Sequence, residues 1–456
     1  MRKGFLGSLA TVALGAGLTV GQDYPPAGPG GGPPEAAFTS PDGHPIIPPP
    51  GFEGMIPPGS LPDGPGGPYP YGGGGGGGGY GSGPGIFEGG GGPPRLWYGA
   101  DFLLWVPKSM PGGSTVVSTS GGADLGILGS PSARALFGDR NIGYGAANGF
   151  RAWLGMSFDE DGRTGFEFGG FLLESRAKSF RLASGTDGLP LIAVPVFDAS
   201  TGANSSYLIA APGIRAGDIR IDTQTRSWGA EGNFVFNLYR ANPEEGSAGS
   251  IDLLAGGRFF ELEERLSVAT STQRINPTLG NSFGGTTLLG SPQITTTDRT
   301  RTFNDFYGGN VGIRGDISFG RLYLGAAGKF GFGYMRQRVE LEGGSSAGTS
   351  TVPGGLFNDT ANLGKFRKDT FAVMPEGNFN IGYQITSRIR AQVGYTFLYV
   401  DRVLRPTAVN SSVVNTSFVP TATGFGTAPV NYTPRDLGKQ SEFWLQGVNF
   451  GFNIQF

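Results

Sequence analysis

The chain has 456 residues, of which 85 are glycine and 34 are proline, so these two residue types make up about a quarter of it. Charged residues are only 15% while aromatic residues reach 12%, and a net charge of -2 gives no basic surface for nucleic acid. The absence of cysteine excludes disulfides and thiolate chemistry, and a single histidine, His44, excludes multi-histidine metal sites. We therefore expect no cofactor, no metal and no nucleic-acid partner.

The first residues have the features of a secretory signal peptide. Arg2 and Lys3 precede an apolar run from Phe5 to Val20, which is followed by the small residue Gly21. A membrane-spanning helix is the alternative, but glycines interrupt the run and it is shorter than the ~20 apolar residues that such a helix needs. We predict a signal peptide over residues 1–21 and export from the cytoplasm.

Residues 22–94 form a segment in which more than half of the positions are glycine or proline, including the run from Gly72 to Gly79. So few apolar side chains cannot offset the entropy of ordering the backbone. We predict a disordered Gly/Pro-rich tether. His44 lies within it, where no rigid frame would hold partners around a catalytic or metal-bound imidazole.

From residue 95 to the last residue, apolar side chains alternate with polar or small ones, which is typical of strands with one apolar face. Most of these segments can reach the ~9–11 residues with which a tilted strand crosses a bilayer. Ten segments show the pattern: 96–106, 150–158, 166–172, 228–238, 253–259, 311–317, 322–332, 371–383, 389–399 and 448–456.

The connections between these segments alternate between short and long, as they do in transmembrane barrels, where the short turns face the periplasm. Short turns are expected at 159–163, 242–246, 319–321 and 384–387, and long loops near 107–147, 182–224, 269–301, 343–366 and 405–440. We predict an all-β fold for residues 95–456: a closed antiparallel up-and-down transmembrane β-barrel of about ten strands. A secreted soluble β-sandwich adhesin is an alternative, although sandwich strands are typically shorter.

Aromatic and aliphatic residues share one face at the C-terminal end, namely Phe452, Ile454 and Phe456. They resemble the last strand of outer-membrane barrels, which the insertion machinery reads as its signal. We therefore predict the outer membrane of a bacterial cell as the location, with membrane lipid and the barrel-insertion machinery as partners. Cell wall and periplasmic proteins are further candidates for contact with the tether.

The faces opposite the apolar ones carry charges of nearly balanced sign, and a barrel of ten strands is narrow enough for side chains to fill it. The candidate lumen-lining residues are Asp101, Arg151, Glu167, Glu231, Asp252, Arg258, Arg314, Asp316, Lys329, Glu376 and Arg390. Unpaired charges are costly where water is scarce, so we expect these residues to pair and to plug the lumen. A narrow channel for ions or small solutes, lined by the same residues, is the alternative.

Enzymatic activity is not expected, because hydrolases usually need a histidine as base or as partner of a nucleophile, and His44 lies in the tether. A structural or surface-presenting role follows from this reasoning.

Short motifs along the body of the chain add a family resemblance. In order, they are Leu103-Leu104-Trp105, Gly257-Arg258 with Leu262 and Glu264, Phe306-Tyr307-Gly308-Gly309, Pro375-Glu376, Gly394-Tyr395-Thr396-Phe397-Leu398-Tyr399, Arg405-Pro406 and Phe443-Trp444-Leu445-Gln446-Gly447. Together they resemble the planctomycete-type outer-membrane β-barrel family, the beta-barrel protein seven family. The resemblance implies a secreted barrel with a variable Gly/Pro-rich leader and carries no catalytic or binding residues. Thr407-Ala408 departs from the glycine expected there, which bears on the last outer loop.

Overall fold

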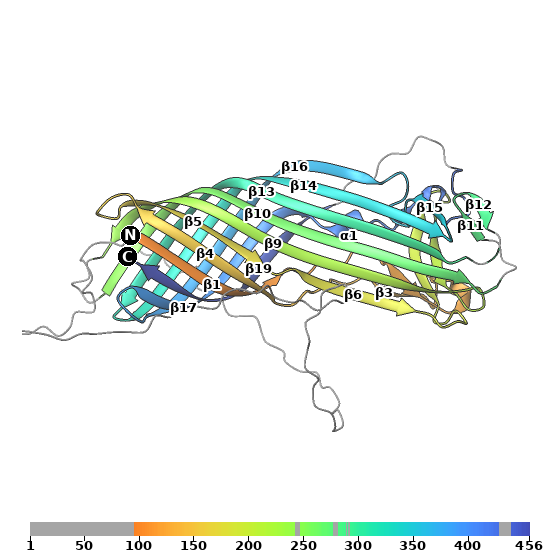
Figure 1. Ribbon diagram of the computed structural model, residues 1–456, viewed down its shortest axis with the longest axis horizontal. Coiled ribbons are helices and arrows are strands. Elements are labelled where there is room, and N and C mark those ends of the chain that lie inside the picture. The colour runs from red at the N-terminus through yellow and green to blue at the C-terminus, as the bar shows by residue number, and fades with distance from the viewer. Residues whose placement is uncertain (1–94, 242–246, 277–280, 289, 291, 428–438) are drawn as a thin grey trace, which may run out of the picture. The chain divides into compact units, whose positions relative to one another are not determined.

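Ten antiparallel strands form a ring in the computed structural model, which describes residues 95–241, 247–276, 281–288, 290, 292–427 and 439–456 (Figure 1). The predicted signal peptide and tether, with His44, lie outside the described residues. Each ring strand is hydrogen-bonded to two neighbours, and the pairing of β9 with β10 completes the ring. In ring order the strands are β1 (Leu96–Pro107), β4 (Ala147–Ser157), β5 (Thr164–Leu173), β9 (Arg215–Arg240), β10 (Ser247–Arg274), β13 (Ile294–Phe319), β14 (Leu322–Ala347), β16 (Gly364–Gln384), β17 (Ile389–Leu404) and β19 (Gln440–Gln455), which pairs with β1. All ten segments predicted from the sequence coincide with these strands, two of them extending one residue beyond the strand end, so the prediction of about ten strands is confirmed.

The two ends of the ring differ. At one end, short turns join β4 to β5, β13 to β14 and β16 to β17, and the amide of Arg95 donates to the carbonyl of Phe456. We call this the turn end and the opposite one the loop end. Among the described residues, no helix has the length and apolar character that crossing a membrane would require.

The ring strands have unequal lengths. β9, β10, β13 and β14 have 26 to 28 residues, whereas β1, β4 and β5 have 10 to 12. The segments near 182–224, 269–301 and 343–366, which were expected to be loops, are therefore partly strand, and the prediction was wrong for these parts. The additional stretches are rich in serine and threonine, as loops are, but their backbone hydrogen bonds to neighbouring strands continue unbroken.

The outward face of the ring near the turn end is apolar and uncovered. Phe150, Phe168 and Phe234 expose 53%, 56% and 50% of their surface, far more than a core phenylalanine would. Four aromatic residues in cross-strand register mark the limit of this band: Phe259, Tyr307, Tyr334 and Phe371. The next outward row toward the loop end is charged: Glu261, Asp305, Arg336 and Asp369. An apolar band with an aromatic girdle is typical of a lipid-facing surface.

At the loop end, the long connections build a second sheet. Its strands are β2 (Val117–Thr119), β3 (Arg134–Phe137), β7 (Ile192–Asp198), β8 (Ala203–Ala210) and β18 (Val413–Val414). Buried side chains of this sheet pack against the inward side of the long strands, with Val117, Ile192, Val194, Ile209 and Val414 meeting Ile219, Ile221, Leu266 and Val268. Two packed sheets thus form this end. The smaller elements are β6 (Arg176–Ala183), β11 (Asn281–Phe283), β12 (Thr286–Leu288), β15 (Ser350–Pro353) and α1 (Pro406–Val409).

Inward glycines make room for two tryptophan rings near the turn end. Gly99 of β1 lies in register with Trp153 of β4, and Trp97 lies in register with Gly155. A Cβ on Gly99 would overlap the indole of Trp153, and one on Gly155 would overlap that of Trp97. Each indole therefore lies over the backbone of the neighbouring strand.

We predict that Gly99→Ala lowers the free energy of unfolding by about 1–3 kcal/mol, because the added methyl group overfills this contact. Gly328→Ala is the matched control, since a Cβ at this strand position would meet no atom within 4 Å. Urea titration of the folded protein in detergent, followed by tryptophan fluorescence, measures both. Equal losses in the two variants would contradict the contact.

Candidate functional site

A cavity of about 1060 Å³ occupies the ring from its turn end inward. Its mouth is lined by residues of the turns and strand ends, among them Arg95, Gly162, Arg321 and Arg388. Its floor is apolar and is lined by Trp105, Phe171, Phe260, Met374 and Leu398. The walls between mouth and floor carry the charged and amide side chains of the ring.

The first group of wall charges centres on Arg314 of β13. Its guanidinium lies 2.9 Å from the Glu167 carboxylate of β5 and 3.2 Å from that of Asp252 on β10. Glu167 also accepts a hydrogen bond of 2.7 Å from the Trp97 indole. Because β9 and β10 separate β5 from β13 in the ring, the contact between Arg314 and Glu167 bridges two intervening strands.

The second group centres on Glu231 of β9, which pairs with Arg258 of β10 at 3.1 Å and with Lys329 of β14. Arg258 also pairs with Glu376 of β16. All four side chains are at most 15% exposed, so each charge depends on its partners. A third pair joins Arg151 of β4 to the fully buried Asp101 of β1, with Nε 3.0 Å from Oδ2.

The structure brings the candidate lumen-lining residues together around this cavity. Arg151, Glu167, Glu231, Asp252, Arg258, Arg314, Asp316, Lys329, Glu376 and Arg390 line it, and Asp101 lies buried against Arg151. Asp316 and Arg390 form no ion pair with another described residue. Asp316 accepts a hydrogen bond from Ser250, and the Arg390 guanidinium lies 3.6 Å from the centre of the Tyr323 ring.

The proposed insertion-signal residues lie on β19 and at its end. Phe452 and Phe456 are outward and more than half exposed, and Ile454 is partly exposed between them. The Phe456 ring stacks on Tyr98 with centroids 6.0 Å apart, and the Arg388 guanidinium lies 5.5 Å from its centre.

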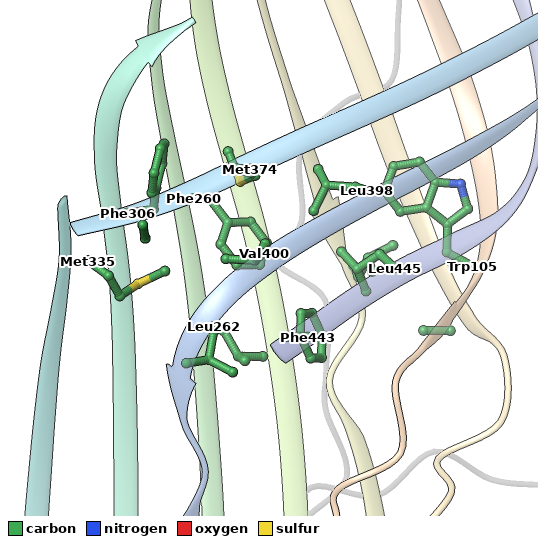
Figure 2. Close-up of a cluster of buried hydrophobic side chains, with 14 of the residues drawn as sticks. Trp105, Phe260, Leu262, Phe306, Met335, Met374, Leu398, Val400, Phe443 and Leu445 are labelled. Carbon is green, nitrogen blue, oxygen red and sulfur yellow. The ribbon is translucent and has the colours of Figure 1, made fainter. Parts of the chain in front are cut away.

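Beyond the floor of the cavity, buried apolar side chains fill the ring. We call them the lumen cluster: Leu103, Trp105, Ala147, Leu173, Phe260, Leu262, Phe306, Met335, Ala372, Met374, Leu398, Val400, Val403, Phe443 and Leu445 (Figure 2). The rings of Phe260 on β10 and Phe443 on β19 have centroids 6.3 Å apart. Four strands separate β10 from β19 in either direction round the ring, so this contact joins opposite walls.

Sequence reasoning missed the lumen cluster, although its signal is present in the alternation. Leu103 and Trp105 share the face of Asp101, and Phe260 shares that of Arg258. Every second residue along each strand lies on the inward face. Following these residues toward the loop end shows that the face changes from charged to apolar. The predicted plug instead rests on the charged residues of this mixed face alone.

On the loop-end side of the lumen cluster lies a fully buried ion pair between Arg405, which follows β17, and Glu264 of β10. The Arg405 guanidinium also lies 5.4 Å from the centre of the Phe443 ring. Nearby, the Asn304 side chain bonds to both the amide and the carbonyl of Leu404, at 2.7 and 2.9 Å. These contacts fix the end of β17 across the ring against β10 and β13.

The described residues contain no cluster of three or more histidine, cysteine, aspartate or glutamate side chains suited to a metal ion. The charged and amide side chains of the cavity walls surround a polar space with fixed charges and dipoles.

Comparison with known proteins gives one family match: the model described as "Putative beta barrel porin-7 (BBP7)" matches residues 97–456. No curated protein matches the chain. Solved structures with some similarity include the outer membrane protease OmpT of Escherichia coli, with 12% identity, 80% of this chain and 97% of that one covered, and a TM-score of 0.36. Another is the toluene transporter TbuX of Ralstonia pickettii, with 10% identity, coverages of 80% and 90%, and a TM-score of 0.18. Similarities at this level establish neither a shared activity nor a shared ligand.

We predict that Glu231→Gln lowers the free energy of unfolding by about 3–5 kcal/mol, because it removes a buried partner of both Arg258 and Lys329. Glu160→Gln is the control, since that carboxylate pairs with Arg95 in an exposed position and its loss should change little. Urea midpoints of the two variants in detergent give the comparison. A Glu231→Gln variant as stable as the control would contradict the role of the pairs.

Proposed function

The chain belongs to the beta barrel porin-7 family, and we propose that it is a transmembrane β-barrel of the bacterial outer membrane with a closed lumen. We further propose a structural and surface-presenting role without enzymatic activity. The ring of ten strands supports the closed barrel, because a bilayer requires that no strand edge be left unpaired in lipid. The apolar outward band with its aromatic row supports the membrane location.

The orientation follows from the connections. In transmembrane barrels the short turns face the periplasm and the long loops face outward. The turn end would then lie in the periplasm, so that the cavity opens there, and the packed sheets of the loop end would lie outside the cell. This orientation agrees with the predicted export through a signal peptide over residues 1–21.

The observation that carries the closed lumen is the contact between Phe260 and Phe443 on opposite walls. Trp105 and Phe171 extend the same row of rings, with centroids 5.2 Å apart, and Phe171 lies 6.4 Å from Phe260. A void in such a layer would be costly, so the side chains pack against each other. In this proposal the lumen cluster forms the plug, and the paired charges expected from the sequence to do so line the cavity beneath it.

The absence of catalysis is supported by how the inward carboxylates are engaged. Of the six candidate lumen carboxylates, Glu167, Asp252, Glu231, Glu376 and Asp101 each pair with a cation, and Asp316 accepts a hydrogen bond from Ser250. A carboxylate held in this way is a poor general base or acid, because both roles require a free change of protonation state. The surface-presenting role is supported by the buried packing of the second sheet at the loop end.

A narrow channel is the second candidate, and the polar cavity favours it. The cavity reaches from the turn end to the lumen cluster, so only this cluster and the layer beyond it would have to move for solutes to pass.

We predict that the refolded protein is silent in planar bilayers, and that the double variant Phe260→Ala with Phe443→Ala gives discrete conductance steps because it removes the contact across the lumen. Phe259→Ala is the matched control, since this neighbouring residue lies on the outward aromatic row. Single-channel recording of folded protein gives the readout.

Steps from the unaltered protein would contradict the closed lumen. If their size or ion preference changed in Arg258→Ala or Glu231→Ala, the channel with a charge-lined path would be the better description. Silence of the double variant would show that the contact between Phe260 and Phe443 alone does not close the lumen.

A further inference from the structure

We propose that the cavity binds a neutral saccharide of more than one ring, entering from the turn end. The inference rests on the proposed function only in taking this end as open to the periplasm. Its basis is the arrangement of two indole rings, a row of amide side chains and a set of mutually paired charges around one polar space.

The two indoles provide flat surfaces within the cavity wall. Inward Gly155 and Gly99 would each direct a Cβ into the lumen, and the rings of Trp97 and Trp153 occupy that space. One face of each ring therefore covers the backbone, which leaves the other face toward the cavity that both residues line. An exposed indole face is apolar and suits the C–H face of a sugar ring. The Arg151 guanidinium lies 5.7 Å from the Trp153 ring centre, whereas the Trp97 indole is held at its edge by its hydrogen bond to Glu167.

Amide side chains lie beside these rings. Gln455 of β19 is in register with Trp97, and Asn453 is in register with Gly99. Further amides continue along the cavity wall on β16 and β17, namely Asn378, Asn380, Gln384 and Gln392. Asn378 donates to Thr396, Gln384 to the carbonyl of Thr386 and Gln392 to Asp101. An amide has two N–H groups and an acceptor oxygen, so hydrogen-bonding groups remain beside these bonds and match a ligand with many hydroxyls. The Asn453 carbonyl oxygen has no hydrogen-bond partner in the described part of the chain.

The charges around the cavity favour a neutral ligand. Arg314, Arg258 and Lys329 are each already paired with carboxylates, so an anion would have to displace buried partners. The lining residues that form no ion pair with described residues are Asp316, Arg240, Arg321, Arg388 and Arg390, and they lie at turns and near strand ends around the mouth rather than deep in the walls. The cavity volume of about 1060 Å³ is at the upper end for drug-sized ligands, which gives room for more than one ring.

The test uses the full refolded chain in detergent and three neutral probes: maltotriose, cellotriose and triacetylchitotriose. Calorimetry and tryptophan fluorescence should show saturable binding of at least one of them with a Kd of about 1 mM or tighter. Trp97→Leu should weaken that binding at least tenfold, and Trp97→Phe should weaken it less because an aromatic face remains. Trp228→Leu is the matched control, since Trp228 lies outside the cavity lining and its indole bonds to Glu261 on the outward face.

A shift between boiled and unboiled samples on a gel establishes the folding of each variant. Should Trp97→Leu fail to fold, Asn453→Ala and Gln455→Ala replace it, with the same expected loss. No binding of any probe to folded protein, undiminished binding in the variants, or tighter binding of a sulfated trisaccharide would overturn the proposal. Silent bilayers combined with absent binding would reject only this inference, whereas conductance combined with binding would reject only the closed lumen.

Discussion

The pairing of both edges of all ten ring strands is the constraint on which the other features depend. Because the backbone groups are satisfied within the ring, the outward face needs no polar side chains and can be apolar over the whole band. The same closure brings the inward side chains face to face at short range, as the Phe260 and Phe443 rings show. Side-chain size therefore becomes critical, and glycine stands opposite tryptophan where two rings must fit against the wall.

Inside the ring, the inward side chains change in character from the turn end to the loop end. Charges lie near the open turn end, where water reaches them and where the most deeply buried ones are paired, so their burial is tolerable. The lumen cluster follows where water is excluded. Past it, the Arg405 and Glu264 pair is enclosed from all sides and is held together with the bonds of Asn304 to Leu404. Several motifs that carry the family resemblance, far apart in the sequence, meet in these two layers.

Much of the ring could be predicted because the alternation is so regular: the apolar residues of each strand locate the strand and show which of its faces points outward. The sequence also shows which residues point inward, but it does not show which inward residues contact each other. That Arg314 meets Glu167 across two strands depends on ring order and stagger, which no local pattern encodes. The second sheet was equally inaccessible, since β2, β7 and β18 come from three separate connections and β18 pairs with β7 in parallel. The serine- and threonine-rich outer halves of the long strands have the composition of loops.

The apolar floor also decides which solutes suit the cavity. An ion moving from the charged wall toward the lumen cluster would lose both its hydration and its fixed partners, and the cost of that transfer is several kcal/mol or more. A neutral, hydroxyl-bearing molecule loses less, because the amides and indoles near the mouth replace its water contacts while the floor covers its apolar edges. The arrangement that makes the proposed barrel a poor ion conductor therefore makes the same space a favourable pocket for a neutral polar ligand.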